Sequence, residues 1–516
     1  MKRFFTAVLA IGFLIGPSLS VESASDKPKR GGTLTVALQR DLTLMNPLVR
    51  TRSTERIIRE LMYEPLLGLD FKGNLQPNLA ESWTASGDGK LYTFNLRRGV
   101  KFHNGQEMMA EDVKFAIDYS MNPKNNAYGF QTLAIVDRVE AADRYGVKIY
   151  LKRPSPAFLL SLVEIGTFSV IPKGSLPDGM DNPPKFPSGT GPFRFVEWQP
   201  QQRVVFERHD DYWGHKAFVD RLVLRPVANA TVRFSALRAG DIDMIERTPY
   251  EWVKQIVEGK LKGISFISAP YAGYRRLVFN VPAAPFNNKK LRQAVAHAID
   301  KKEILHAAYF GFGEPADQIY PKGHAWYIDG ISSPAQDLNK ARALLKESGY
   351  KGETIEFVTQ QGEDVEPTTL QAQLRKIGIN VNVKILDYGA YTALQRRGEF
   401  TFDFMGSGDY LDPSGAYGAN LMCELDLKKR TANDSGYCDK EMEALVKKAE
   451  SEMDPAKRKA LFKQIVTKLA EDVPELPVGF VPRFFAVADH VKGFTTDGKG
   501  ALRPWGGGVN YAWLDK

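Results

Sequence analysis

Two short stretches of the chain come near to motifs of enzymes, and each lacks a residue that the chemistry needs. In residues 493–500, a phosphate-binding loop would need Ser or Thr after Lys499, but Gly500 stands there, so we expect a turn. Ser348 and Lys351 have the spacing of a serine nucleophile and its lysine, yet Ser348 ends a predicted helix and both companion motifs are missing. The sequence has no His-Glu-x-x-His, Gly-x-Ser-x-Gly or Cys-x-x-Cys motif. These patterns predict that the protein is not an enzyme.

Cys423 and Cys438 are the only cysteines, and they flank a polar segment. In an oxidising compartment such a pair most simply forms one disulfide that closes the segment. The alternative is two free buried thiols, because the sequence does not give their separation in space. His103 is expected to be structural, since no second His or Cys stands at ligand spacing. We predict no metal site and no cofactor.

The N-terminus has the pattern of a secretory signal. Lys2 and Arg3 precede an apolar run over residues 4–16, which is shorter than the roughly 20 residues of a membrane-spanning helix. No Cys follows that could carry a lipid. We assign residues 1–23 to a cleaved signal peptide and 24–31 to a flexible leader. The mature protein is therefore expected in the periplasm, if the host has an outer membrane.

Composition is that of a large globular protein. The 516 residues are 43% hydrophobic and 25% charged, which is enough chain for two or three cores. The net charge is +8, but the 69 basic and 61 acidic residues are intermixed along the chain. A nucleic-acid-binding protein would cluster its basic residues on one face, so we do not expect nucleic acid as a partner.

Short β-type runs alternate with amphipathic helices, which predicts an α/β protein with more than one sheet. The predicted strands are 33–38, 147–151, 193–198, 203–207, 222–226, 276–280, 353–359 and 380–386. The predicted helices are 110–120, 230–239, 289–299, 339–348, 368–377, 439–452 and 455–471. The helix 339–348 is especially well marked, because Asp337 precedes it as a cap and Gly349 follows it.

Residues 77–113 carry the most specific pattern, PNLAESWTASGDGKLYTFNLRRGVKFHNGQEMMAEDV. Within it, alternation over 91–96 predicts a strand, Asn104-Gly105 predicts a turn, and residues 110–112 predict a helix start. As an ordered string it resembles the signature of bacterial extracellular solute-binding proteins of family 5, the receptors of peptide- and nickel-type ABC importers.

Further blocks extend this resemblance over nearly the whole mature chain. They are residues 188–193, 238–243, 279–287, 291–300, 340–350 and 374–381. Most of their conspicuous residues are expected to be structural. Gly189 and Gly191, for example, are expected to supply backbone angles that a side chain would forbid.

The resemblance implies a periplasmic binding protein of two hinged lobes with mixed sheets, plus an extra domain. The assignment is lobe I over 32–66, 186–275 and 482–516, the extra domain over 67–185, and lobe II over 276–481. The ligand would lie between the lobes, which close around it by a hinge motion. The implied partners are a small solute and the permease subunits in the inner membrane, and we expect a monomer.

The resemblance also points to a ligand-binding stretch over residues 402–413. In peptide-binding members a similar stretch supplies an aspartate that pairs with the ammonium of the ligand, and Asp409 falls at that position. Its alternative role is to stabilise a turn. We include its neighbours Ser407, Gly408, Tyr410 and Asp412 in the site, although Asp412 is expected chiefly to shape the loop.

Arg40 and Asn46, just after the first strand, complete the predicted site. They either line the mouth of the cleft or are ordinary loop residues.

Two departures from the family pattern bear on the solute. Ser407 stands where a Trp is often found, which removes a stacking wall. Residues 359–367 contain three acids and no Arg, so a dipeptide site with an arginine clamp for the ligand carboxylate is not expected.

The sequence therefore predicts a receptor for a peptide or peptide-like solute, held along its backbone. The alternatives are an opine, sugar-amine, nickel or haem receptor, and an enzyme or chaperone on the same fold.

Overall fold

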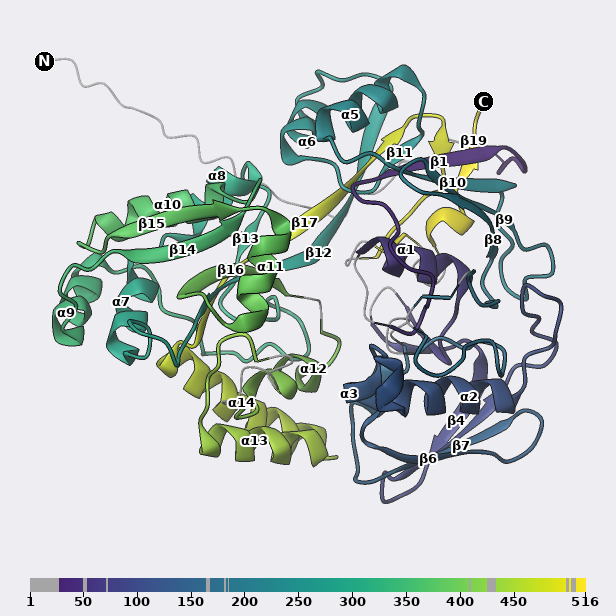
Figure 1. Ribbon diagram of the computed structural model, residues 1–516, viewed down its shortest axis with the longest axis horizontal. Coiled ribbons are helices and arrows are strands. Elements are labelled where there is room, and N and C mark those ends of the chain that lie inside the picture. The colour runs from purple at the N-terminus through teal and green to yellow at the C-terminus, as the bar shows by residue number, and fades with distance from the viewer. Residues whose placement is uncertain are drawn as a thin grey trace, which may run out of the picture.

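The structure is a computed structural model, and it confirms the mixed α/β class expected from the sequence (Figure 1). It describes residues 27–49, 53–70, 73–163, 168–180, 182–183, 185–407, 410–424, 433–497, 501–502 and 507–516. The predicted signal peptide, residues 1–23, lies outside these ranges. Below, the first half means residues 32–275 with 482–516, and the second half means residues 276–481.

Within the described residues, the largest sheet has nine strands and draws on both halves. They are β1 (Thr33–Leu38), β8 (Phe193–Gln199), β9 (Arg203–Arg208), β10 (Arg221–Pro226), β11 (Met244–Ile245), β12 (Ile264–Phe279), β13 (Glu314–Pro315), β16 (Phe402–Ser407) and β17 (Glu475–Ala488). Their order is β16-β12-β17-β11-β1-β10-β9-β8, and β13 pairs with β17. β1 pairs in parallel with both β10 and β11, which places the first strand of the chain inside the sheet.

The antiparallel strands β12 and β17 run from one half to the other (Figure 1). Their pairing extends from Ile264 with Ala488 to Val278 with Glu475. The register shifts at residues 270–272, which stand opposite Pro482. Because a bulge bends a strand and interrupts its ladder, we expect the two halves to hinge here.

A second sheet lies at one end of the first half (Figure 1). It is antiparallel, in the order β4-β5-β7-β6, and the strands are β4 (Ala80–Ala85), β5 (Leu91–Leu96), β6 (Val136–Ala141) and β7 (Gly146–Leu151). Helix α2 (Ala110–Met121) packs on it through buried Val113 and Ile117. The Asp112 carboxylate accepts the N–H of Met109 at 2.8 Å and so begins the helix. The most specific stretch of the sequence, residues 77–113, thus supplies two of the four strands, β4 and β5, and the first turn of the helix.

Smaller elements complete the first half. They are α1 (Ser53–Met62), β2 (Leu67–Leu69), β3 (Leu75–Pro77), η1 (Pro123–Asn125), α3 (Phe130–Leu133), α4 (Phe158–Ser161), α5 (Ala230–Ala239), α6 (Tyr250–Val257), β18 (Val491–Lys492), η3 (Gly508–Asn510) and β19 (Trp513–Leu514).

The second half is mainly helical around the parallel pair β14 (Ile355–Gln360) and β15 (Val381–Leu386). Its helices are α7 (Lys289–Ala298), α8 (Lys301–Tyr309), α9 (Leu338–Ser348), α10 (Val365–Arg375), α11 (Tyr388–Arg397), α12 (Pro413–Tyr417), η2 (Ala419–Leu421), α13 (Lys440–Ser451) and α14 (Pro455–Asp472). Asp337 caps α9 by accepting from Asn339 and Lys340, and Gly349 ends it at φ 74°, as the sequence predicts.

The apolar cores follow the two halves. One cluster joins the large sheet of the first half to the sheet over residues 67–185, through side chains such as Leu34, Phe94 and Phe206. Two other clusters lie in the second half, one around Phe279 and Phe402 and the other around Phe462. The extra domain therefore shares a continuous core with lobe I, and its boundaries stay a prediction.

Gly189 and Gly191 are needed for a reason that the sequence does not show. Neither has a positive φ, so the expectation of special backbone angles is wrong. A Cβ on Gly189 would lie 1.9 Å from the Met62 carbonyl oxygen, and one on Gly191 would lie 2.5 Å from the Leu61 oxygen. Both glycines therefore let the chain pass directly against the end of α1.

His103 contacts the Gly191 carbonyl through Nε2 at 3.0 Å. Burial lowers the pKa of His103 to about 3, consistent with a structural role.

Candidate functional site

The predicted ligand-binding stretch begins where β16 ends. Ser407 is the last residue of β16 and pairs with Tyr274 of β12. Gly408 and Asp409 lie outside the described residues, so their predicted role stays a prediction. The chain is described again from Tyr410 onward, where it leads into α12.

Tyr410 lines a small cavity, here called the Tyr410 cavity, at the point where β12 and β17 enter the second half. Its polar lining residues are Tyr274, Arg276, Tyr410, Tyr417, Asn420, Asp434, Ser435 and Glu475. Burial raises the pKa of Tyr410, and likewise that of Tyr274, so both phenols are neutral donors at physiological pH. The cavity therefore offers hydroxyl, amide, carboxylate and guanidinium groups beside the predicted loop.

Arg276 is the central charged group of the Tyr410 cavity. It donates to Asp434 at 2.6 Å through Nη2 and to Glu475 through Nη1. The Arg276 side chain is 8% exposed, whereas Asp434 is 42% exposed and Glu475 is 20% exposed. One cation between two carboxylates leaves the cavity with a formal surplus of negative charge, which favours a cationic or hydrogen-bond-donating group of a solute.

Asp412 stabilises the loop from within. Arg458 of α14 donates to both of its carboxylate oxygens, at 2.7 and 2.5 Å, and Asp412 also accepts the N–H of Ser414 as the cap of α12. Asp412 is 6% exposed and Arg458 is 3% exposed. Such a bidentate buried pair fixes geometry, and this supports the loop-shaping role expected for Asp412 over direct solute contact.

The two residues predicted after the first strand have different environments. The Arg40 guanidinium lies 4.8 Å from the ring centroid of Tyr388, the first residue of α11, so Arg40 reaches from the first half to the second. Asn46 is 2% exposed and donates to the Tyr119 hydroxyl and the Met180 carbonyl. The structure thus gives the Asn46 amide a structural role inside the first half.

An arginine does reach the acidic stretch 359–367, but it comes from β12. Arg275 donates to Glu366 through Nε at 3.0 Å and through Nη2, and the Tyr309 hydroxyl donates to the same carboxylate at 2.7 Å. Glu366 is 4% exposed. Because Glu366 neutralises Arg275, this arginine is not a free clamp for a solute carboxylate.

Asp403 of β16 is a buried acid near these groups. Its Oδ2 accepts from the Tyr391 hydroxyl at 2.6 Å and from Gln395 Nε2 at 2.8 Å, both on α11. Its Oδ1 has no hydrogen-bond partner among the described residues. Burial raises the pKa of Asp403 to about 7, against the two hydrogen bonds, which act to lower it.

Sequence reasoning missed Arg275, Arg276 and their partners. The usable signal was a pair of arginines inside an otherwise apolar strand, since a charged side chain there must be paired. Their positions on alternating sides of β12 send Arg275 to Glu366 and Arg276 to Glu475.

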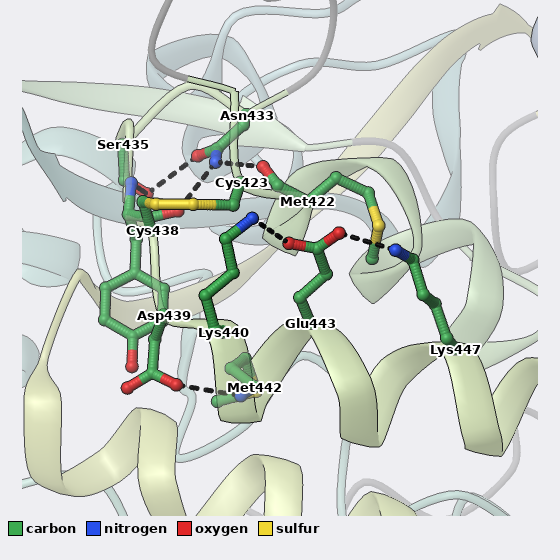
Figure 2. Close-up of a disulfide and its surroundings, with 11 residues drawn as sticks. Met422, Cys423, Asn433, Ser435, Cys438, Asp439, Lys440, Met442, Glu443 and Lys447 are labelled. Carbon is green, nitrogen blue, oxygen red and sulfur yellow. Dashed lines mark hydrogen bonds and ion pairs between the residues drawn. A yellow bond between two sulfur atoms is a disulfide. The ribbon is translucent and has the colours of Figure 1, made fainter.

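The disulfide holds the chain that follows α12 and η2 (Figure 2). Cys423 and Cys438 are bonded, with their Cα atoms 4.4 Å apart, just before α13 begins. Asn433 lies inside the closed segment and donates to the carbonyls of Met422 and Tyr437, at 2.9 and 2.8 Å. The same segment carries Asp434, so the disulfide also anchors one wall of the Tyr410 cavity.

The described part of the chain shows neither a metal-binding cluster nor a membrane-spanning helix. Among those residues, no three His, Cys, Asp or Glu side chains gather as they would around a metal ion. None of the helices described is long and apolar enough to span a bilayer.

Comparison with known proteins gives this geometry a context. Residues 74–424 match the family "Bacterial extracellular solute-binding proteins, family 5 Middle". The dipeptide-binding protein of Escherichia coli K12 is 30% identical over 454 residues, which cover 82% of this chain and 84% of that protein. The haem-binding protein A of Haemophilus influenzae is also 30% identical, over 82% of each chain.

A solved structure shows the same fold. An ABC transporter-associated periplasmic binding protein from Helicobacter pylori, in complex with the peptide STSA, superimposes with a TM-score of 0.80. The two sequences are 27% identical, and the match covers 95% of this chain and 99% of that one. The chain belongs to family 5 of the bacterial extracellular solute-binding proteins, which are solute receptors of ABC transporters and not enzymes.

Proposed function

We propose that this receptor captures a peptide or peptide-like solute between its two halves and delivers it to the permease subunits of an importer in the inner membrane. The observation that carries this proposal is the placing of the predicted ligand loop. The loop is described up to Ser407, which pairs with β12, and again from Tyr410, which lines the Tyr410 cavity beside the two connecting strands. A solute bound there contacts the part of the molecule that moves when the halves close.

The chemistry of the site favours a solute with a free ammonium group. The Tyr410 cavity has two carboxylates, Asp434 and Glu475, for the single cation Arg276. Asp409, the predicted ligand residue, would add a further carboxylate to the site. Because Arg275 is neutralised by Glu366, recognition of a short dipeptide by a carboxylate clamp is disfavoured. A longer peptide, held by its backbone and its ammonium end, fits these groups better.

The kinship with peptide receptors supports the same choice. The Escherichia coli relative is named a dipeptide-binding protein, and the Helicobacter pylori structure holds a peptide. The second candidate is a haem-type solute, which the Haemophilus influenzae relative favours by its name. Opine, sugar-amine and nickel solutes remain further alternatives within the same transport role. Delivery from the periplasm follows from the predicted signal peptide.

Thermal unfolding with and without candidate solutes tests this proposal. We expect a mixed tetra- to hexapeptide pool to raise the Tm by several degrees, because a ligand that binds only the folded state stabilises it. Haemin, nickel–histidine and opines are the comparison solutes, and N-acetylated peptides are the matched control. Stabilisation by a comparison solute and not by peptides would reject the peptide assignment. Mass spectrometry of solute that co-purifies with the protein provides an independent identification.

A further inference from the structure

Arg153 forms a contact between the halves that lies outside the predicted solute loop. It follows β7 in the first half, and its guanidinium donates to Glu450 and Ser451 at the end of α13 in the second half. Both N···O distances are 2.9 Å. The side chains of Arg153 and Glu450 are 45% and 20% exposed, so the contact is partly shielded from solvent.

An apolar contact lies beside this ion pair. A Cβ placed on Gly89, in the turn between β4 and β5, would lie 3.1 Å from the Met453 Cε and 3.4 Å from the Pro154 Cβ. Gly89 has a φ of 67° and offers bare backbone to the Met453 side chain. The corner between α13 and α14 therefore meets the sheet of the first half through both polar and apolar groups.

Glu450 also connects this contact with the predicted solute loop. Its Oε1 lies 2.5 Å from where a Cβ on Gly418 would be, so Glu450 packs directly against the end of α12. Burial raises the pKa of Glu450, while Arg153 and then Arg458 act to lower it. Arg458 is the residue that holds Asp412, at the start of the same helix. The carboxylate is thus shared between the contact of the halves and the base of the loop.

We propose that Arg153 is a positioning residue that favours the closed state and, through Glu450, steadies the base of the solute loop. The halves are connected by β12 and β17, and Arg153 belongs to the first half whereas Glu450 belongs to the second. A hinge motion that opens the halves must separate them. The part of the chain over residues 67–185 then has a definite task, which is to contribute to closure. This inference rests on the proposed solute-receptor function.

Small-angle X-ray scattering of solute-free protein tests the closure. Bound solute is removed by unfolding in guanidinium chloride and refolding, and far-UV circular dichroism confirms the fold. We expect Arg153→Ala to raise the ratio of open to closed molecules by about threefold in 20 mM NaCl, with a larger radius of gyration. In 500 mM NaCl the open-to-closed ratio and the radius of gyration of the wild type should approach those of the variant, because salt screens the ion pair.

Matched variants separate positioning from general damage to the fold. Arg153→Lys should retain part of the stabilisation of the closed state, since an ammonium keeps the charge of the guanidinium but not its forked geometry. Arg144→Ala is the control, because it removes an exposed ion pair with Glu107 inside the first half and should leave the radius unchanged. Equal radii for the wild type and Arg153→Ala in low salt would overturn the proposal.

A second measurement uses the synthetic peptide Ser-Thr-Ser-Ala as the probe. We expect Arg153→Ala to raise its dissociation rate about threefold with little change in the association rate, as expected for a contact that forms on closure. An unchanged dissociation rate would contradict the link to the loop. If no peptide binds the wild type, the proposed solute class fails, and the scattering experiment still decides the closure independently.

Discussion

At the scale of single residues, most buried charges of the second half have an opposite charge as a close partner. Glu366 has Arg275, Arg276 has Glu475, and Arg458 has Asp412. Asp403 differs, because its hydrogen bonds come from neutral groups. A buried carboxylate held only by neutral donors is costly to ionise, so the protonation of Asp403 is coupled to folding.

We expect stability to fall as pH rises because of Asp403. The folded pKa of about 7 lies above the ordinary value near 4, so the folded state binds the proton more tightly. The stabilisation is complete below about pH 4 and is lost as pH rises through 7. Between pH 5 and 8 the wild type should lose on the order of 2–3 kcal/mol relative to Asp403→Asn. Urea unfolding at both values measures this, with the exposed Asp137→Asn as control. Parallel pH profiles for the wild type and Asp403→Asn would contradict it.

Asp409 provides the residue-scale test of the proposed solute chemistry. Asp409→Asn keeps the size of the side chain and removes its charge. We expect it to weaken binding of Ser-Thr-Ser-Ala by about ten- to hundredfold, the range for a hydrogen bond to a charged group. Isothermal titration calorimetry measures the affinity. The N-acetylated peptide lacks the ammonium and should bind wild type and variant equally weakly. If the acetylated peptide binds the wild type as tightly as the free peptide does, Asp409 does not recognise the ammonium group.

At the scale of elements, the sequence predicted best those helices whose ends are marked by capping residues. Helix α5 was predicted with its observed bounds, 230–239, and α9 within one residue, because polar caps and glycines mark their ends. β17 was missed because Pro477 and Pro482 interrupt its apolar pattern, and its register is set by a partner far away in the sequence. The site divides in the same way. The resemblance predicted the loop, whereas the pairing of Arg276 with Glu475 required the fold.

The disulfide offers an element-scale prediction for stability. It closes a segment with a sequence separation of 15, for which the chain-entropy estimate is about 3 kcal/mol. We expect the Cys423→Ser/Cys438→Ser double variant to lose roughly this much free energy of unfolding in urea. Wild-type protein treated with dithiothreitol should show the same loss. If the double variant has the same free energy of unfolding as the oxidised wild type, the segment is held by other contacts, such as those of Asn433.

At the scale of the whole molecule, the large apolar clusters of the two halves are separate, and the halves are joined by two strands and by aromatic contacts such as that of Phe484 with Phe312. The first-half cluster around Phe94 and Phe206 does not include the second-half clusters around Phe279 and Phe462. β12 and β17 pass between them with an interrupted ladder. Such a connection allows each half to unfold with its own stability, while a solute that contacts both halves links their unfolding. The separation of the two halves thus permits closure and also limits the cooperativity of unfolding.

Tryptophan positions make this limit measurable. Trp326 is the single tryptophan of residues 276–481, and the other six lie at positions 83, 198, 213, 252, 505 and 513. In Trp326→Phe, fluorescence therefore reports on the first half, whereas circular dichroism at 222 nm reports on both. Trp326 packs in the second-half core against Phe462, so Phe keeps an aromatic ring there.

Without solute, we expect the two urea transitions to have different midpoints. A saturating peptide should bring them together by stabilising both halves at once. Coincident transitions in the solute-free protein would mean that the β12–β17 connection already couples the cores, and the hinge would then have to be stiffer than its bulge suggests.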